Sequence, residues 1–197
     1  MAERSPAMPA YKIKRKNVLH LEEVLGLIKE TNDERMKCLI ALAYTFGSRI
    51  TEMLRLKRDD FRIQGDRLQA DFILEKKKAN ENMPMLPTWT REIATTYPLV
   101  TFIWTYVEKV PRGEFIFKSS HSASGHLTRI WAHENLKVLD SNLCWHFFRR
   151  SVITNVVHET KNMMAGKQIA GHATVKTTEI YVENDPSINE LLAVRNY

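Results

Sequence analysis

The chain has few cysteines and no long apolar run, and these two features exclude several classes of protein. Its two cysteines, Cys38 and Cys144, stand far apart in apolar surroundings without metal-ligand spacing. Two small buried thiols are therefore favoured over a redox or zinc role. The longest apolar stretches, such as residues 39–46, are too short to span a bilayer. The N-terminus has charges and prolines but no apolar signal-peptide core.

Internal repeats and low-complexity blocks are also missing. The chain has 197 residues, of which 44% are hydrophobic, and this length buries a core without disulfides. We therefore expect one globular domain with short appendages, in a soluble protein of a reducing, cytoplasmic compartment. Acidic residues are outnumbered, because 29 Lys and Arg face 23 Asp and Glu, which gives a formal charge of +6. This excess favours a polyanionic partner, most simply nucleic acid.

Composition divides the chain into three regions. Residues 1–17 hold two prolines and a basic run and are interpreted as a leader or linker, either a solvated tail or a strap along phosphates. Residues 18–185 carry the periodic patterns of the domain itself. Residues 186–197 form an amphipathic tail after Pro186, with apolar side chains at helical spacing. The apolar side chains of the tail can pack on the domain itself.

The periodicity predicts an α+β fold that is mainly α-helical with one small antiparallel sheet. Alternation over residues 68–74 and a Gly65-Asp66 turn place the sheet within residues 62–86, with Lys76, Lys77 and Lys78 in its middle turn. Spacing of apolar residues predicts the helices. They are expected over residues 20–29, 34–46, 51–56, 89–109 with a break at Pro98, 127–138, 142–158, 161–170 and 174–182.

Three segments carry residues suited to phosphate chemistry. Arg49 follows Gly47 at the expected start of a helix, which Ser48 or Thr51 could cap, and offers a planar fork for two phosphate oxygens. The plain alternative is a surface arginine paired with Glu52 or Asp59.

His146 and Arg149 form the second segment. They are three residues apart, so they share one face of a helix and can approach one ligand.

The third segment runs from residue 169 to residue 182. Gly171 and His172 indicate a turn between helices, and Tyr181 lies in or at the end of the next helix. Each of these residues alone is more typical of capping or packing than of catalysis.

In combination, the three segments resemble the motif boxes of the tyrosine recombinases, the phage integrase family, over about residues 18–183. The patterns are G-x-R-[IS]-x-E, H-x-x-R and G-H-x-x-x-x-T-T-x-x-Y. The matching residues here are Gly47, Arg49 and Glu52, then His146 and Arg149, then Gly171, His172, Thr177, Thr178 and Tyr181. Ser48, Arg150 and Ala170 depart from the residues usual at their positions, but no catalytic side chain is lost.

The resemblance implies the tyrosine-recombinase catalytic-domain fold and a covalent mechanism without metal or cofactor. Tyr181 would be the nucleophile, His146 the base, and Arg49 and Arg149 the groups that neutralise the phosphate. His172 would donate a further hydrogen bond to the phosphate, and Glu52 would orient Arg49.

The family also uses a lysine on a β-hairpin between the first two boxes. Lys76 occupies the expected position, although Lys77 and Lys78 follow directly and leave the register open. That lysine would protonate the leaving oxygen.

The resemblance further implies double-stranded DNA as substrate and a tetramer of the full-length enzyme, with the isolated domain a possible monomer. It also implies an alternative for residues 186–197, which would dock on a neighbouring subunit of the tetramer instead of packing on their own domain. Because relatives carry an N-terminal clamp domain, we expect the chain to be a fragment of a longer enzyme, with an unusual minimal member as the alternative. Two other functions stay open: a non-catalytic DNA-binding module, and a type IB topoisomerase or telomere resolvase.

Overall fold

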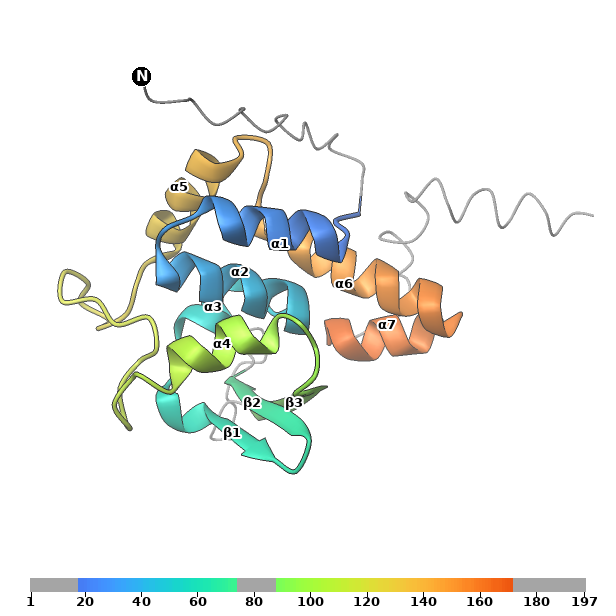
Figure 1. The fold of residues 1–197 in the computed structure, drawn as a ribbon, viewed down its shortest axis with the longest axis horizontal. Coiled ribbons are helices and arrows are strands. Elements are labelled where there is room, and N and C mark those ends of the chain that lie inside the picture. Colours follow the sequence, from blue (N-terminus) through green and yellow to red (C-terminus); the bar gives the residue numbers. More distant parts are fainter. Residues whose placement is uncertain (1–17, 74–87, 172–197) are drawn as a thin grey trace, which may run out of the picture.

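The computed structural model describes residues 18–73 and 88–171, which fold into a helical bundle with a small sheet along one side (Figure 1). The helices in these ranges are α1 (Leu21–Glu30), α2 (Glu34–Phe46), α3 (Ile50–Leu54), the 3-10 helix η1 (Arg58–Asp60), α4 (Val100–Val107), α5 (Arg129–Leu139), α6 (Trp145–Thr160) and α7 (Met163–Ala170). The strands are β1 (Phe61–Gln64), β2 (Arg67–Ile73) and β3 (Thr88–Ala94). This confirms the expected mainly helical fold with a small antiparallel sheet.

Helix α2 is the centre of the bundle and packs against α1, α4 and α6. Apolar side chains surround it almost completely, as is expected of a helix with neighbours on every side. Asp33 caps its start, because its side chain accepts a hydrogen bond from the Arg35 N–H at 2.8 Å. Gly47 ends it in a left-handed conformation. The two ends of α2 are therefore fixed by local sequence.

The chain enters the bundle through Leu19, which is fully buried. Its N–H donates to the Ser151 hydroxyl at 2.8 Å, and its carbonyl accepts from the Tyr44 hydroxyl at 3.0 Å. The same Tyr44 oxygen accepts from the Asn155 side chain at 3.1 Å. Leu19 is thus bound to both α2 and α6 before α1 begins.

The sheet is a three-stranded antiparallel meander in the order β1-β2-β3. Alternate residues of β2 face the bundle, where Leu68, Ala70 and Phe72 are buried. The Phe72 ring lies 5.5 Å from the ring of Phe46, the last residue of α2. This contact places the sheet against the C-terminal end of the central helix.

Strand β3 corrects a prediction. Residues 89–109 were expected to be helical, but residues 88–94 pair with β2, with Thr88 opposite Ile73, and only Val100–Val107 form a helix. The β-branched and aromatic residues of β3 favour a strand, and pairing with β2 satisfies their backbone groups. The helices expected over residues 20–29, 34–46, 127–138, 142–158 and 161–170 are confirmed within a few residues at each end.

Within the described ranges, no helix combines the length and apolar character needed to cross a bilayer. The two thiols differ in exposure, since Cys38 is fully buried and Cys144 is partly exposed. Burial raises the pKa of Cys38 well above its ordinary value, and the nearby Glu34 carboxylate adds to this effect. Because the thiolate is the reactive form, Cys38 should resist alkylation in the folded protein.

We therefore expect iodoacetamide at pH 8 to modify Cys144 alone in the native protein and both thiols in denaturant. Mass spectrometry of the time course gives the measurement, and Cys144→Ala is the matched variant, which should stay unmodified while folded. Equal native rates at the two positions would contradict the buried placement of Cys38.

Candidate active site

A tight turn between α2 and α3 positions the first candidate residue, Arg49. Gly47 makes the turn with φ +59°, and a Cβ built there would lie 3.1 Å from Cβ of Val152 on α6. Glycine supplies both the left-handed backbone and the close approach of the two helices. Arg49 then follows as the N-cap of α3.

Arg49 is held by a buried carboxylate. One Glu52 oxygen accepts from the Arg49 guanidinium at 2.7 Å, and the other accepts from the Arg49 backbone N–H at 2.9 Å. The Glu52 side chain is 1% exposed, whereas that of Arg49 is 26% exposed. Because the carboxylate binds both parts of Arg49, it fixes where the guanidinium points and leaves part of it accessible to a ligand.

This arrangement corrects the expected cap of α3. The prediction was Ser48 or Thr51, but the Glu52 side chain instead accepts a hydrogen bond from the backbone N–H of Arg49, the N-cap residue. Within the described residues the buried Ser48 hydroxyl has no hydrogen-bond partner. The alternative partner for Arg49, Asp59, instead accepts from the Gly113 N–H at 2.7 Å.

Arg149 on α6 brings the three sequence motifs together. It is 4% exposed, and its Nη1 donates to the Gly47 carbonyl at 2.6 Å. Its Nη2 donates to the carbonyl of Ala170, the last residue of α7. One side chain of the second motif therefore links the first motif to the third. Both acceptors lie at helix C-termini, where a cation is favoured.

His146 lies one turn before Arg149 on α6 and is exposed, unlike the buried arginine. The spacing of three residues places both on one side of the helix. His146 is therefore the more accessible member of this pair.

A second arginine, Arg91 on β3, is partly buried and joins the cluster, and it was not predicted from the sequence. Its guanidinium donates to the carbonyls of Phe46 and Ile169, the latter at 2.7 Å. The pKa of Arg91 is lowered to about 10, mainly by its removal from water; the charge of Arg149 contributes to this lowering, while Glu52 opposes it. Since this pKa remains above neutrality, Arg91 is still charged at pH 7.

The described cluster therefore combines three guanidinium groups with one buried carboxylate. The arginines are Arg49, Arg91 and Arg149, and the carboxylate is Glu52. Such an excess of fixed positive charge in a partly desolvated setting suits an anion, and above all a phosphate that gains charge during reaction. In the part of the chain that the structure describes, no cluster of His, Cys, Asp or Glu is arranged to hold a metal ion.

The remaining candidates lie outside the described residues: Lys76 with its neighbours Lys77 and Lys78, His172, and Tyr181. The structure thus gathers Arg49 and Arg149, adds Arg91, and places His146 on the same helix as Arg149. The alternation of Trp89, Arg91 and Ile93 could have indicated a strand, but it gave no sign of the partners that bring Arg91 into the cluster.

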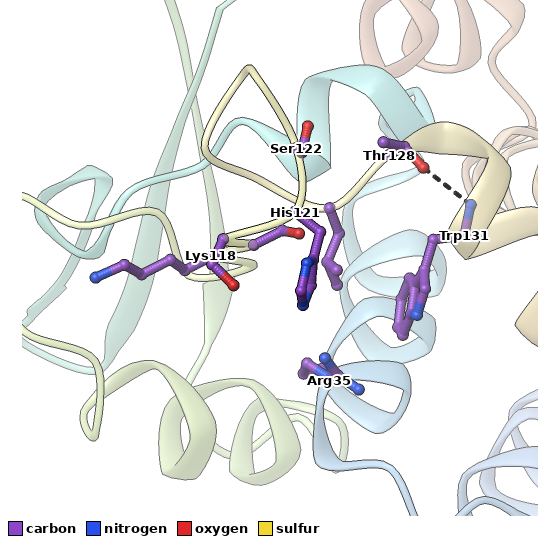
Figure 2. A pocket seen from close by; sticks show the side chains of 9 residues that line it. Arg35, Lys118, His121, Ser122, Thr128 and Trp131 are labelled. Carbon is purple, nitrogen blue, oxygen red and sulfur yellow. Dashed lines mark hydrogen bonds between the residues drawn. The ribbon is translucent and has the colours of Figure 1, made fainter.

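A separate pocket of about 530 Å³ opens at the other end of α2 (Figure 2). Arg35, Lys118, His121 and Trp131 line it, with Thr128, which caps α5 through the Trp131 N–H. Its arginine and lysine are already paired with acids, Arg35 with Asp33 and Lys118 with Glu114. From Arg35 to Gly47 the helix rises about 18 Å, so the pocket is remote from the arginine cluster.

Comparisons of the chain with a family profile, with curated proteins and with solved structures all lead to one family. The profile of the "Phage integrase family" matches residues 17–187. "Tyrosine recombinase XerD" of Staphylococcus epidermidis is 26% identical over 183 residues, covering 88% of this chain and 60% of that protein. The chain thus spans less than two thirds of the curated relatives' length.

Two solved structures illustrate the shared fold. The crystal structure of XerA recombinase matches with a TM-score of 0.68 at 20% identity, covering 100% of this chain and 67% of that one. XerH site-specific recombinase bound to difH substrate, in a pre-cleavage complex, matches with a TM-score of 0.62 at 18% identity, covering 82% of this chain and 47% of that one.

Proposed function

Because the chain belongs to the phage integrase family, we propose that it is the catalytic domain of a site-specific DNA recombinase. It would cleave and rejoin double-stranded DNA through a 3′-phosphotyrosyl bond to Tyr181. The relatives named tyrosine recombinase XerD, and the XerH structure described as bound to its difH substrate, support this reaction and this partner.

One observation carries the proposal: Arg149 links the first and third motifs while Arg49 is held beside it on a buried carboxylate. Two guanidinium groups oriented by protein contacts can bind the non-bridging oxygens of a phosphate as it becomes pentavalent. Preorganisation matters because the donors then need no rearrangement when charge develops. Arg49 and Arg149 are therefore assigned to phosphate stabilisation.

In the cleavage step, the Tyr181 oxygen forms a bond to phosphorus and the bond from phosphorus to the 5′-oxygen breaks. A phenol has an ordinary pKa of about 10, so its proton must be accepted during attack, and His146 is the proposed base. Lys76 protonates the departing 5′-oxygen, and His172 donates a hydrogen bond to the phosphate. The products are a 3′-phosphotyrosine and a free 5′-hydroxyl.

In the joining step, a 5′-hydroxyl from the partner strand attacks the phosphotyrosine and the bond to Tyr181 breaks. The number of phosphodiester-type bonds is conserved, so the reaction needs no nucleotide cofactor. Exchange between two DNA sites requires several active sites at once. We propose a tetramer of the full-length protein on DNA, with residues 186–197 docking on a neighbouring subunit and residues 1–17 serving as a basic leader.

The proposal predicts a metal-independent covalent adduct that depends on Tyr181. The protein and Tyr181→Phe are incubated side by side, without added metal, with a pool of random-sequence duplexes that each carry a nick. Loss of the short 5′ fragment next to the nick traps the intermediate. An adduct that survives denaturation is expected for the wild type, and complete loss is expected for Tyr181→Phe, because no other group replaces the phenol.

Each other outcome has a defined meaning. Equal adduct in both proteins would rule out Tyr181 as nucleophile. Adduct in neither, in spite of measurable DNA binding, would contradict catalysis by this chain and favour a non-catalytic DNA-binding module. A separate product assay tests the two related enzymes: relaxation of supercoiled circles alone would favour a topoisomerase, and hairpin ends would favour a telomere resolvase.

A further inference from the structure

Arg91 bridges the ends of two helices that carry the site. One terminal nitrogen donates to Phe46, the last residue of α2, and the other donates at 2.7 Å to Ile169, the penultimate residue of α7. These partners are 45 and 78 residues away in sequence. The contacts are therefore tertiary, and they join the sheet to both helix ends.

Aromatic rings fix the plane of this guanidinium. Its carbon lies 4.5 Å from the centre of the Trp89 ring and 5.6 Å from that of Phe72. Both rings belong to the sheet, and Phe72 also contacts the Phe46 ring. Contacts between a guanidinium and an aromatic face are favourable, especially when they are desolvated. Arg91 thus has little freedom to reorient.

The carbonyls that bind Arg91 and those that bind Arg149 are direct neighbours in sequence. Arg149 donates to Gly47 and Ala170, while Arg91 donates to the residues immediately before them. The two arginines therefore form parallel bridges between the same two helix ends. Moving either helix end would change both bridges together.

We propose that Arg91 is a positioning residue, which holds the ends of α2 and α7 at the separation at which Arg149 bridges them and so sets the orientation of Arg149. The expected effect on the reaction rate rests on the proposed function, whereas the expected effect on the orientation of Arg149 does not depend on it. Arg91 is partly buried, forms its bridge beside that of Arg149, and acts through Arg149.

The position of Arg91 has an electrostatic cost that supports this role. Burial and the charge of Arg149 both disfavour its protonated form, and Nε has no hydrogen-bond partner within the described residues. A cation that has lost most of its contact with water must be compensated by other groups. The two carbonyls at helix C-termini and the two rings supply that compensation, because each lies toward the cation with its negative side.

Two substitutions separate the bridge from the charge. Arg91→Lys keeps a positive charge, but one ammonium lacks the planar fork that binds two carbonyls. Arg91→Met removes both charge and bridge while keeping an unbranched apolar chain beside Trp89. Arg35→Met is the matched control, since Arg35 also lies over a tryptophan, Trp131 at 4.9 Å, but in the remote pocket (Figure 2).

The first measurement is NMR of the arginine guanidinium groups in the whole chain, with Arg149→Lys used to assign the Arg149 signal. Wild-type Arg149 should show hindered rotation and slow proton exchange. In both Arg91 variants its exchange should accelerate by at least about tenfold, while backbone spectra show a retained fold. Arg35→Met should leave the Arg149 signal unchanged. An unchanged Arg149 signal in folded Arg91→Met would overturn the proposal.

The second measurement is the rate of adduct formation on nicked duplexes at saturating DNA. Both Arg91→Lys and Arg91→Met should react about 100-fold more slowly than wild type with little change in DNA affinity, because misplacement of a reacting group has this magnitude. Near-normal rates in Arg91→Lys alone would show that charge suffices and would overturn the bridge. Absence of adduct in wild type contradicts the proposed function, and the NMR result then still decides whether Arg91 positions Arg149.

Discussion

Arg149→Met is expected to destabilise the fold and abolish adduct formation together. The substitution leaves the Gly47 and Ala170 carbonyls without their buried donor. An unsatisfied buried carbonyl costs about 1–3 kcal/mol, and relief of the repulsion with Arg91 offsets part of the loss, so we expect about 2–4 kcal/mol off the free energy of unfolding. Urea unfolding followed by circular dichroism measures this change, and the nicked-duplex assay measures the adduct.

The neighbouring arginine provides the control for stability. Nε and Nη2 of Arg150 are buried but have no hydrogen-bond partner among the described residues. Arg150→Met removes the same charge from the same helix without breaking a bond to either nitrogen, so we expect a change within about 1 kcal/mol, in either direction. If the two variants lost equal stability, the bridge formed by Arg149 would not be the cause.

Gly171→Ala is the second substitution with a large expected effect. Gly171 has φ +59°, and a Cβ there would lie 2.8 Å from Cζ3 of Trp89. Left-handed strain costs about 1–2 kcal/mol and overpacking adds about 1–3 kcal/mol, so we expect a loss of about 2–5 kcal/mol in unfolding free energy. Adduct formation should fall as well, because Gly171 directly precedes His172, one of the proposed catalytic residues.

Two further variants isolate the contact with the ring. Gly65 has the same φ of +59° but nothing within 4 Å of its Cβ position. Gly65→Ala should therefore cost only the backbone strain, about 1–2 kcal/mol. In the Trp89→Leu background, Gly171→Ala should approach this smaller cost, because the obstructing ring is gone. Equal losses for Gly65→Ala and Gly171→Ala in the native background would show that Trp89 yields easily.

Much of the bundle could be predicted because its helices have local signals. Apolar spacing predicted α1 and α2, and Gly47 marked the end of α2. Strand β3 was missed because seven residues rich in Thr, Trp and Ile are compatible with either element until a partner strand is known. Pairing with β2 makes residues 88–94 a strand instead of a helix, and such pairing leaves no local signal in the sequence.

The site was predictable in its residues but not in its connections. The motifs selected Arg49 and Arg149, yet they indicated phosphate binding alone and gave no sign that Arg149 holds two helix ends together. Arg91 carries no motif at all. Its partners are set by how the sheet packs against α2 and α7, so only a three-dimensional arrangement identifies it. The cap of α3 was missed for a similar reason, since Glu52 competes with the nearer hydroxyls of Ser48 and Thr51.

The entry of the chain at Leu19 has a mechanical consequence. A pull transmitted along the backbone to this residue is resisted at once by Ser151 on α6 and Tyr44 on α2, through both its N–H and its carbonyl. A force applied at residue 18 is therefore transmitted through these hydrogen bonds to α2 and α6 without first stretching α1. Tension applied to the chain before Leu19 is therefore borne by α2 and α6 before it reaches α1.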